Sequence, residues 1–107
     1  MSARPVTVID YGIGNLLNVV RALQHCGADV TVVDQASQVQ SLPERLVLPG
    51  VGAFADGMRG LRERGLIGPI CRYAASGRPL LGICLGMQML ASASTEFGEH
   101  EDRKSVV

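Results

Sequence analysis

The residues best suited to chemistry lie in the stretch RPLLGICLGMQML, residues 78–90, where one cysteine stands between two glycines. The run GICLG, residues 82–86, is the cysteine form of the G-x-S-x-G nucleophile elbow, a sharp turn from a strand into a helix. Such a turn places Cys84 at the start of the helix, where free N–H groups and the helix dipole favour a thiolate. Cys84 is therefore predicted to be a nucleophile, the alternative being a structural cysteine in a tight turn.

An elbow nucleophile needs donors for the oxyanion that forms when it attacks a carbonyl group. The elbow aims the backbone N–H of Leu85 at that oxygen. The run PGVG, residues 49–52, is the candidate for a second donor, because its proline fixes the turn and its glycines allow close approach of the backbone. We expect the amides of Val51 and Gly52 to serve in this way.

Gln88 follows Cys84 by four residues, which places the two on the same face of the expected helix. Its amide is predicted to bind a small polar substrate, the alternative being a solvated helix residue. The other two cysteines, Cys26 and Cys71, are expected to be small buried hydrophobic residues. No C-x-x-C pair is present, so the sequence predicts no disulfide framework, no metal site and no cofactor.

Apolar runs and glycine-rich turns alternate along the chain in a way that predicts strands and helices in turn. The segment 35–44 is polar and its structure is left open. A break is expected near Gly68-Pro69 in the helical stretch 58–76. The expected strands are residues 6–10, 28–34, 45–52 and 78–84, and the expected helical stretches are 15–27, 58–76 and 85–94.

This alternation predicts an α/β fold, a three-layer doubly wound parallel sheet. The loops that follow the strands should share one rim, where ligands bind. Three turns would meet there: DYGIGN (residues 10–15), PGVG and CLG. YGIGN lacks the third glycine and the lysine of phosphate-binding loops, so it is expected to be a tight turn that caps the next helix through Asn15.

The chain has 107 residues with ten acidic and ten basic side chains, which predicts one domain without affinity for nucleic acid or anionic membranes. Its first ten residues have no long apolar run, so neither a signal peptide nor a membrane span is expected. A cytoplasmic protein is predicted.

Three motifs together resemble a known family: DYGIGN, LVLPGVGAF and PLLGICLGMQML. They are similar to the N-terminal half of the class I glutamine amidotransferase subunit of imidazole glycerol phosphate synthase, from histidine biosynthesis. The resemblance covers residues 5 to 100. The block 1–101 would then be half of a class I amidotransferase domain, and the tail 102–107 does not match.

The resemblance implies that Cys84 opens the side-chain amide of glutamine and releases ammonia. Residues matching positions that hold glutamine or its oxyanion are Gly52, Leu85 and Gln88, and Glu96 matches one that meets the amino-acid end. The ammonia would pass to a (β/α)8-barrel cyclase subunit in a heterodimer. The docking residues that this resemblance implies are Tyr11, Gly12 and Asn15.

Family members are about twice this length, and their catalytic histidine and glutamate lie in the second half. His25 should lie at the opposite edge of the sheet from Cys84, and His100 has no strand to fix it. The chain by itself is therefore expected to be inactive. We expect it to be a truncated reading of a longer gene, because its own last residues, DRKSVV, can be back-translated as the start of a common sequencing adapter. Two alternatives stay open: a cysteine hydrolase of the PfpI type using Asp10, and a non-catalytic module that binds the cyclase.

Overall fold

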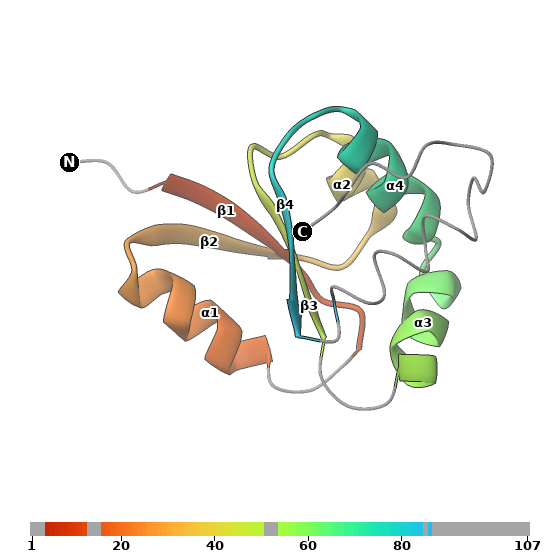
Figure 1. Ribbon diagram of the computed structural model, residues 1–107, viewed down its shortest axis with the longest axis horizontal. Coiled ribbons are helices and arrows are strands. Elements are labelled where there is room, and N and C mark those ends of the chain that lie inside the picture. Colours follow the sequence, from red (N-terminus) through yellow and green to blue (C-terminus); the bar gives the residue numbers. More distant parts are fainter. Residues whose placement is uncertain (1–3, 13–15, 51–53, 85, 87–107) are drawn as a thin grey trace.

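The protein is described by a computed structural model, which places residues 4–12, 16–50, 54–84 and Gly86. These described residues form a parallel sheet of four strands in the order β2-β1-β3-β4, with helices packed around it (Figure 1). The α/β parallel fold predicted from the sequence is confirmed for this part of the chain. The strands are β1 (Arg4–Ile9), β2 (Ala28–Val33), β3 (Leu46–Gly50) and β4 (Leu80–Cys84), and the helices are α1 (Leu16–His25), α2 (Ala36–Gln40), α3 (Phe54–Glu63) and α4 (Ile67–Ala75).

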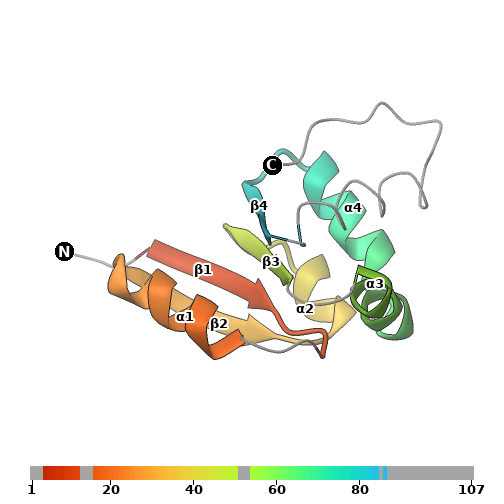
Figure 2. The same ribbon diagram turned by 60° about the horizontal axis from the view of Figure 1, so that its bottom comes forward.

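The helices divide between the two faces of the sheet. The chain passes from β1 to β2 in one direction and from β2 through β3 to β4 in the other. Because crossovers between parallel strands are right-handed, α1 lies on one face and α2, α3 and α4 lie on the other (Figures 1 and 2). The direction changes between β1 and β3, and such a switch point is where ligands bind in open α/β sheets.

The main core lies between the sheet and the helices α2, α3 and α4. Alternate residues of the strands face it, so Ile9, Val33 and Leu48 belong to one buried cluster. The helices α3 and α4 contribute residues spaced by three, which form one apolar stripe on each helix. The stripe members are Met58 and Leu61 on α3 and Ile67, Ile70 and Tyr73 on α4. All five residues of β3 are buried, as its continuous apolar run predicts.

The break in the helical stretch 58–76 was predicted at the wrong residue. It lies at Gly65, not at Gly68-Pro69, because Gly65 adopts a φ of +64° that ends α3. The Gly65 N–H donates to the Arg62 carbonyl over 3.0 Å, and the Leu66 N–H donates to the Leu61 carbonyl over 2.9 Å. Pro69 lies in the first turn of α4, where a helix tolerates proline.

The short helix α2 occupies residues 36–40 of the segment 35–44, whose structure the sequence left open. A side chain organises its start: the Gln38 Oε1 atom accepts hydrogen bonds from the backbone N–H groups of Asp34 over 3.1 Å and Gln35 over 3.0 Å. These bonds satisfy donors that the first turn of a helix leaves free. The helix then buries Val39 in the core.

The face of the sheet on the α1 side is more open. The helix α1 has no buried residue. Val32 and Leu81, which alternate with the core-facing Val33 and Leu80, are 43 % and 47 % exposed. The described part of the sheet thus shows apolar side chains to solvent near both of its edges.

Candidate active site

Cys84 and Gly50 end neighbouring strands and lie opposite each other in the sheet. The register of β3 and β4 pairs Leu46 with Leu80 and continues to the pair Gly50 and Cys84. Because the strands are parallel, both residues lie at the carboxyl edge, where the loops after the strands gather. Gly50 belongs to the run PGVG and directly precedes the expected oxyanion donors Val51 and Gly52, which we call the oxyanion loop. The backbone of the predicted nucleophile therefore lies beside the residue that leads into this loop.

The structure supports the sharp turn expected after Cys84. The strand β4 ends at Cys84, and Gly86, two residues later, has helical conformation. Gly86 is buried, and a Cβ atom at this position would collide with the backbone carbonyl oxygen of Leu48 in β3. A glycine is therefore required because the turn passes so close to the neighbouring strand.

The turn after β1 is tight, as expected from its glycines. Asp10 Oδ1 accepts a hydrogen bond of 3.1 Å from the Gly12 N–H, and Gly12 has a φ of +92° that favours glycine. Gly12 is exposed at the rim. This position leaves it accessible to another protein, while its predicted role in docking stays a prediction.

Tyr11 has a structural role that the sequence interpretation missed. Its side chain is 1 % exposed, and its hydroxyl group donates a hydrogen bond to the carbonyl oxygen of Pro49 in β3. Burial raises the pKa of the phenol. Tyr11 was singled out as a docking residue, but its ring faces the core and offers no surface to a partner. The alternation of Thr7, Ile9 and Tyr11 on one face of the chain was the signal that could have revealed this.

The backbone of Tyr11 is held by α3 and the turn that follows it. Arg64 Nη1 donates a hydrogen bond of 3.1 Å to the Tyr11 carbonyl oxygen. At Gly60 a Cβ atom would lie 2.5 Å from that same oxygen, so α3 approaches the turn more closely than any other residue would allow. The residue is thus fixed through its carbonyl group and through its hydroxyl group.

Several predicted site residues lie outside the described residues. Their predicted roles as oxyanion donors, glutamine-binding residues, helix cap or docking residue stay predictions. The same holds for the expected helix 85–94 and the tail 102–107. The residues concerned are Val51, Gly52, Leu85, Gln88, Glu96, Asn15 and His100.

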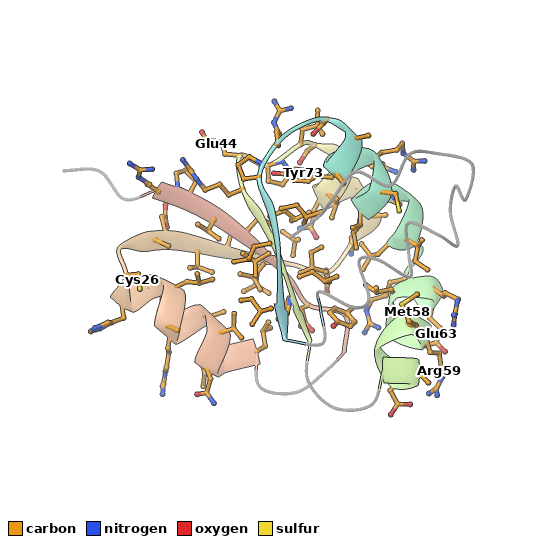
Figure 3. The ribbon with its side chains drawn as sticks, in the orientation of Figure 1. Cys26, Glu44, Met58, Arg59, Glu63 and Tyr73 are labelled. Atoms are coloured by element: carbon orange, nitrogen blue, oxygen red, sulfur yellow. The ribbon has the colours of Figure 1, made fainter. Side chains whose placement is uncertain are left out.

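His25 lies where the sequence placed it, far from Cys84. It is the last residue of α1, three residues before the start of β2 at Ala28, which pairs with the first residue of β1. That is the amino edge of the sheet. Figure 3 shows the neighbouring Cys26 at this end of α1. His25 therefore cannot serve Cys84 as a base.

The two remaining cysteines differ from each other. Cys71 is half-buried and packs against the core, as predicted. Cys26 was predicted to be buried but is exposed, because it follows the last turn of α1, whose residues are not buried against the sheet. Neither of these two thiols forms a disulfide bond.

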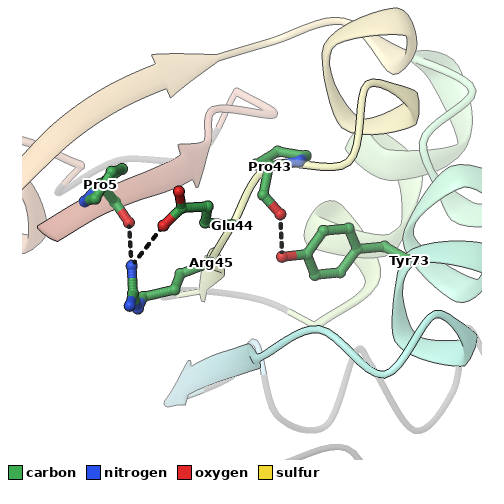
Figure 4. Close-up of polar contacts among 5 residues, drawn as sticks. All are labelled: Pro5, Pro43, Glu44, Arg45 and Tyr73. Atoms are coloured by element: carbon green, nitrogen blue, oxygen red, sulfur yellow. Dashed lines mark hydrogen bonds and ion pairs between the residues drawn. The ribbon is translucent and has the colours of Figure 1, made fainter.

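The amino edge of the sheet has a polar arrangement of its own (Figure 4). The Tyr73 hydroxyl group donates a hydrogen bond of 2.7 Å to the Pro43 carbonyl oxygen. Arg45 Nη1 donates to the Pro5 carbonyl oxygen over 3.1 Å and lies 3.2 Å from Glu44 Oε1. These contacts join the start of β3 to α4 and to β1, on the side away from Cys84.

Metal sites and membrane spans are both missing from the described part of the chain. It contains no group of three or more His, Cys, Asp or Glu residues that could hold a metal ion. Within the same residues, no helix has both the length and the apolar character needed to cross a membrane.

The chain is similar in sequence to known proteins over most of its length. The chain is 57 % identical over 96 residues to imidazole glycerol phosphate synthase subunit HisH 1 of Legionella pneumophila (strain Paris), a match covering 90 % of this chain and 45 % of that protein. It is 50 % identical over 96 residues to subunit HisH of Moorella thermoacetica, with the same shares covered. The chain thus spans about half the length of these curated relatives.

Solved structures and a family profile extend the comparison. A crystal structure of a protein described as a GMP synthase subunit, from Thermoplasma acidophilum, superposes with a TM-score of 0.63 at 25 % identity over 87 % of this chain and 46 % of that one. A protein described as a peptidase E, from Listeria monocytogenes EGD-e, shares the fold with a TM-score of 0.64 at 15 % identity, over 98 % and 62 % of the two chains. The profile of the family Glutamine amidotransferase class-I matches residues 7–105. The chain therefore belongs to the class I glutamine amidotransferase family.

Proposed function

We propose that this chain is part of the glutaminase subunit of an imidazole glycerol phosphate synthase. Such a subunit hydrolyses glutamine to glutamate and ammonia, and the ammonia is used by a cyclase subunit in histidine biosynthesis. The observation that carries the proposal is the pairing of Gly50 with Cys84 at the carboxyl edge, in a chain 47–57 % identical to HisH subunits. That pairing supports the proposal because Gly50 directly precedes Val51 and Gly52, the proposed oxyanion donors.

The reaction begins with attack of the Cys84 thiolate on the side-chain amide carbon of glutamine. A C–S bond forms, and the carbonyl oxygen becomes an oxyanion, for which the N–H groups of Leu85, Val51 and Gly52 are the proposed donors. The C–N bond then breaks, and the nitrogen leaves as ammonia after gaining a proton. Water hydrolyses the remaining glutamyl thioester to glutamate and restores the thiol.

The proton transfers need a general acid and base within reach of Cys84. His25 is at the opposite edge of the sheet, so it cannot act there. We propose that the histidine and glutamate of this family come from the further length that the relatives have, and that residues 1–107 alone do not turn over glutamine. Gln88 and Glu96 are the proposed contacts to the glutamine substrate.

The proposed partner is a (β/α)8-barrel cyclase, bound as a heterodimer in the cytoplasm. The rim that carries Cys84 also carries Gly12, which is exposed. A partner that receives ammonia must bind at this rim, because ammonia released into water would be protonated and lost. Gly12 and Asn15 are therefore the proposed contacts, and Tyr11 supports them from beneath.

The alternative of a PfpI-type cysteine hydrolase depends on Asp10 as a carboxylate that assists Cys84. Asp10 Oδ1 already accepts a hydrogen bond from the Gly12 N–H in its own turn. In addition, β3 lies between β1 and β4 in the sheet, which separates Asp10 from Cys84. The glutaminase is therefore the better supported function.

The test uses the full-length product of the gene, mixed with its cyclase partner, and measures glutamate released from glutamine. Cys84→Ser should abolish release, because a serine hydroxyl is a far weaker nucleophile than a thiolate at neutral pH. Cys26→Ser is the matched control and should retain full activity, since Cys26 is exposed at the opposite edge. Glutamate release that persists in Cys84→Ser would overturn the assignment.

The remaining alternative is a non-catalytic module that only binds the cyclase. It makes a different prediction in the same experiment, namely that the unmodified full-length protein binds the cyclase without releasing glutamate. Measuring binding and glutamate release on one sample separates the two functions.

A further inference from the structure

The hydrogen bond between the Tyr11 hydroxyl group and the Pro49 carbonyl oxygen joins the turn after β1 to the last residues of β3. The two residues are 38 positions apart in the sequence, and both are fully buried. The bond crosses the switch point between β1 and β3, where the direction of the chain connections changes. It therefore lies under the part of the rim where a ligand is expected.

The bond fixes one specific peptide unit. The Pro49 carbonyl group and the Gly50 N–H are the two ends of one planar unit, so holding the oxygen also sets the direction of the N–H. Pro49 has no N–H of its own for the sheet ladder, and Gly50 has no side chain to restrict its backbone. The Pro49 ring limits backbone rotation on one side of this peptide, and the pairing with β4 holds Gly50 on the other. The hydrogen bond from Tyr11 adds a direct restraint on the carbonyl oxygen between them.

We propose that Tyr11 is a positioning residue that sets the orientation of the oxyanion-binding backbone after β3, through Pro49 and Gly50. The inference rests on the proposed glutaminase function. Gly50 pairs with Cys84 and directly precedes Val51 and Gly52, whose amides are the proposed donors. A rotation of the Pro49–Gly50 peptide would change the direction of the Gly50 N–H in the residue that pairs with Cys84, directly before the proposed donors.

Tyr11 is itself held firmly enough to act as such an anchor. The Arg64 guanidinium group donates to its carbonyl oxygen over 3.1 Å, and Gly60 of α3 lies directly against the same oxygen. Its ring is 1 % exposed among core residues. The hydroxyl group can therefore transmit a fixed position from α3 to the rim.

The chain contains a matched control for this contact. Tyr73 is also 1 % exposed, and its hydroxyl group also donates to a proline carbonyl oxygen, that of Pro43. Pro43 precedes β3, whereas Pro49 lies near its end. Two similar tyrosine bonds thus hold opposite ends of one strand, and only the end held by Tyr11 pairs with Cys84. Figure 4 shows the bond of Tyr73.

The first experiment compares Tyr11→Phe with Tyr73→Phe in the full-length protein with its cyclase partner. Both variants lose one buried hydroxyl group, and both should melt at a lower temperature than the unmodified protein. Tyr11→Phe should lower kcat for glutamine hydrolysis by about 10-fold to 100-fold, because small displacements of catalytic groups have effects of that size. Its KM should change little, because the oxyanion forms only as the reaction proceeds and is absent from the bound substrate. Tyr73→Phe should leave kcat unchanged.

Equal kcat values for the two variants, whether both unchanged or both reduced, would overturn the proposal. In the first case Tyr11 has no role in the reaction, and in the second the effect reports general stability. A Tyr11→Phe variant with raised KM and unchanged kcat would also overturn it, because the residue would then act on substrate binding.

A second readout does not depend on activity. Pro49–Gly50 is the only Pro-Gly pair in residues 1–107. Labelling proline with carbonyl 13C and glycine with 15N therefore gives, among these residues, one peptide signal in an NMR spectrum that correlates the two labels. Its signal should shift in Tyr11→Phe and stay in place in Tyr73→Phe. If Cys84→Ser retained activity, the glutaminase assignment would fail, while this signal would still decide whether Tyr11 orients the peptide. An unmoved signal in Tyr11→Phe would overturn the positioning role.

Discussion

Gly50 and Cys84 are the last residues of two neighbouring parallel strands, and they lie opposite each other in the register of these strands. The pairing follows from a register that starts four residues earlier, at Leu46 and Leu80. Any slip of one residue between β3 and β4 would turn the core residues Leu46 and Leu48 to the other face. The buried side chains of β3 therefore fix the position of the nucleophile's backbone relative to the loop that follows Gly50.

Gly86→Ala should disrupt the turn after Cys84. Its Cβ atom would meet the backbone carbonyl oxygen of Leu48, which cannot rotate away. We expect the free energy of unfolding to fall by about 2–3 kcal/mol, as for an overpacked core, together with a loss of glutaminase activity. Urea unfolding of the full-length protein checks this.

The matched control for Gly86→Ala is Gly27→Ala. Gly27 has a φ of +96°, but nothing lies within 4 Å of a Cβ atom placed there. The substitution should reduce stability by about 1 kcal/mol through backbone strain alone and leave activity intact, because Gly27 lies at the amino edge. Equal losses of activity in both variants would contradict a specific role for the contact between Gly86 and Leu48.

The sequence was sufficient for the features that depend on simple periodicity. A continuous apolar run such as that of β3 is typical of a strand buried on both faces, and residues 46–50 are all buried. The alternation of strands and helices predicted the parallel sheet. Together these placed Cys84 and the start of the oxyanion loop at one rim, since parallel strands bring their carboxyl ends to the same edge.

Features set by specific three-dimensional contacts were not predicted. The end of α3 depends on the left-handed backbone of Gly65. Composition could not rank the four candidate breakers in residues 58–76, which are Gly60, Gly65, Gly68 and Pro69. The start of α2 depends on the Gln38 side chain. The role of Tyr11 depends on Pro49, 38 residues away. Its alternation with Thr7 and Ile9 was a signal for burial, but no local pattern identifies the hydrogen-bond partner.

The stability of the protein should fall at high pH in a way that depends on Tyr11. Burial raises the pKa of its phenol above the ordinary value of about 10. The unfolded chain therefore loses this proton first as the pH rises, and the stabilising contribution is complete below about pH 10 and lost progressively above it. Tyr11→Phe should show a shallower fall in the free energy of unfolding above that pH.

The check is a series of urea unfolding curves from about pH 8 to 11, a range that spans the ordinary tyrosine pKa. Tyr73→Phe is the control. Burial also raises the pKa of Tyr73, but the positive charges of Arg78 and Arg45 oppose the shift, so its removal should change the slope less. Parallel pH profiles for Tyr11→Phe and the unmodified protein would contradict the prediction.

Cys84 should react faster with iodoacetamide near neutral pH than an ordinary thiol, if the strand-to-helix turn favours its thiolate. Cys26 is exposed and would also react, so the experiment uses a Cys26→Ser background. Peptide mass spectrometry then compares the modification rates of Cys84 and Cys71, which is half-buried against the core. Equal rates would show that the turn alone does not activate Cys84 and that a histidine partner is required.

The 107-residue chain alone should self-associate through the face of the sheet that carries α1. Leu81 of β4 and Val32 of β2 are 47 % and 43 % exposed there, and apolar strand surface near a sheet edge promotes association. Leu81→Lys should keep the chain monomeric to higher concentration in sedimentation velocity. Leu17→Lys is the control, because Leu17 is 59 % exposed on the helix α1 rather than on a strand of the sheet. A sharp, reversible and concentration-independent melt of the unmodified chain would contradict this prediction, since it would mean that the open face does not need a cover.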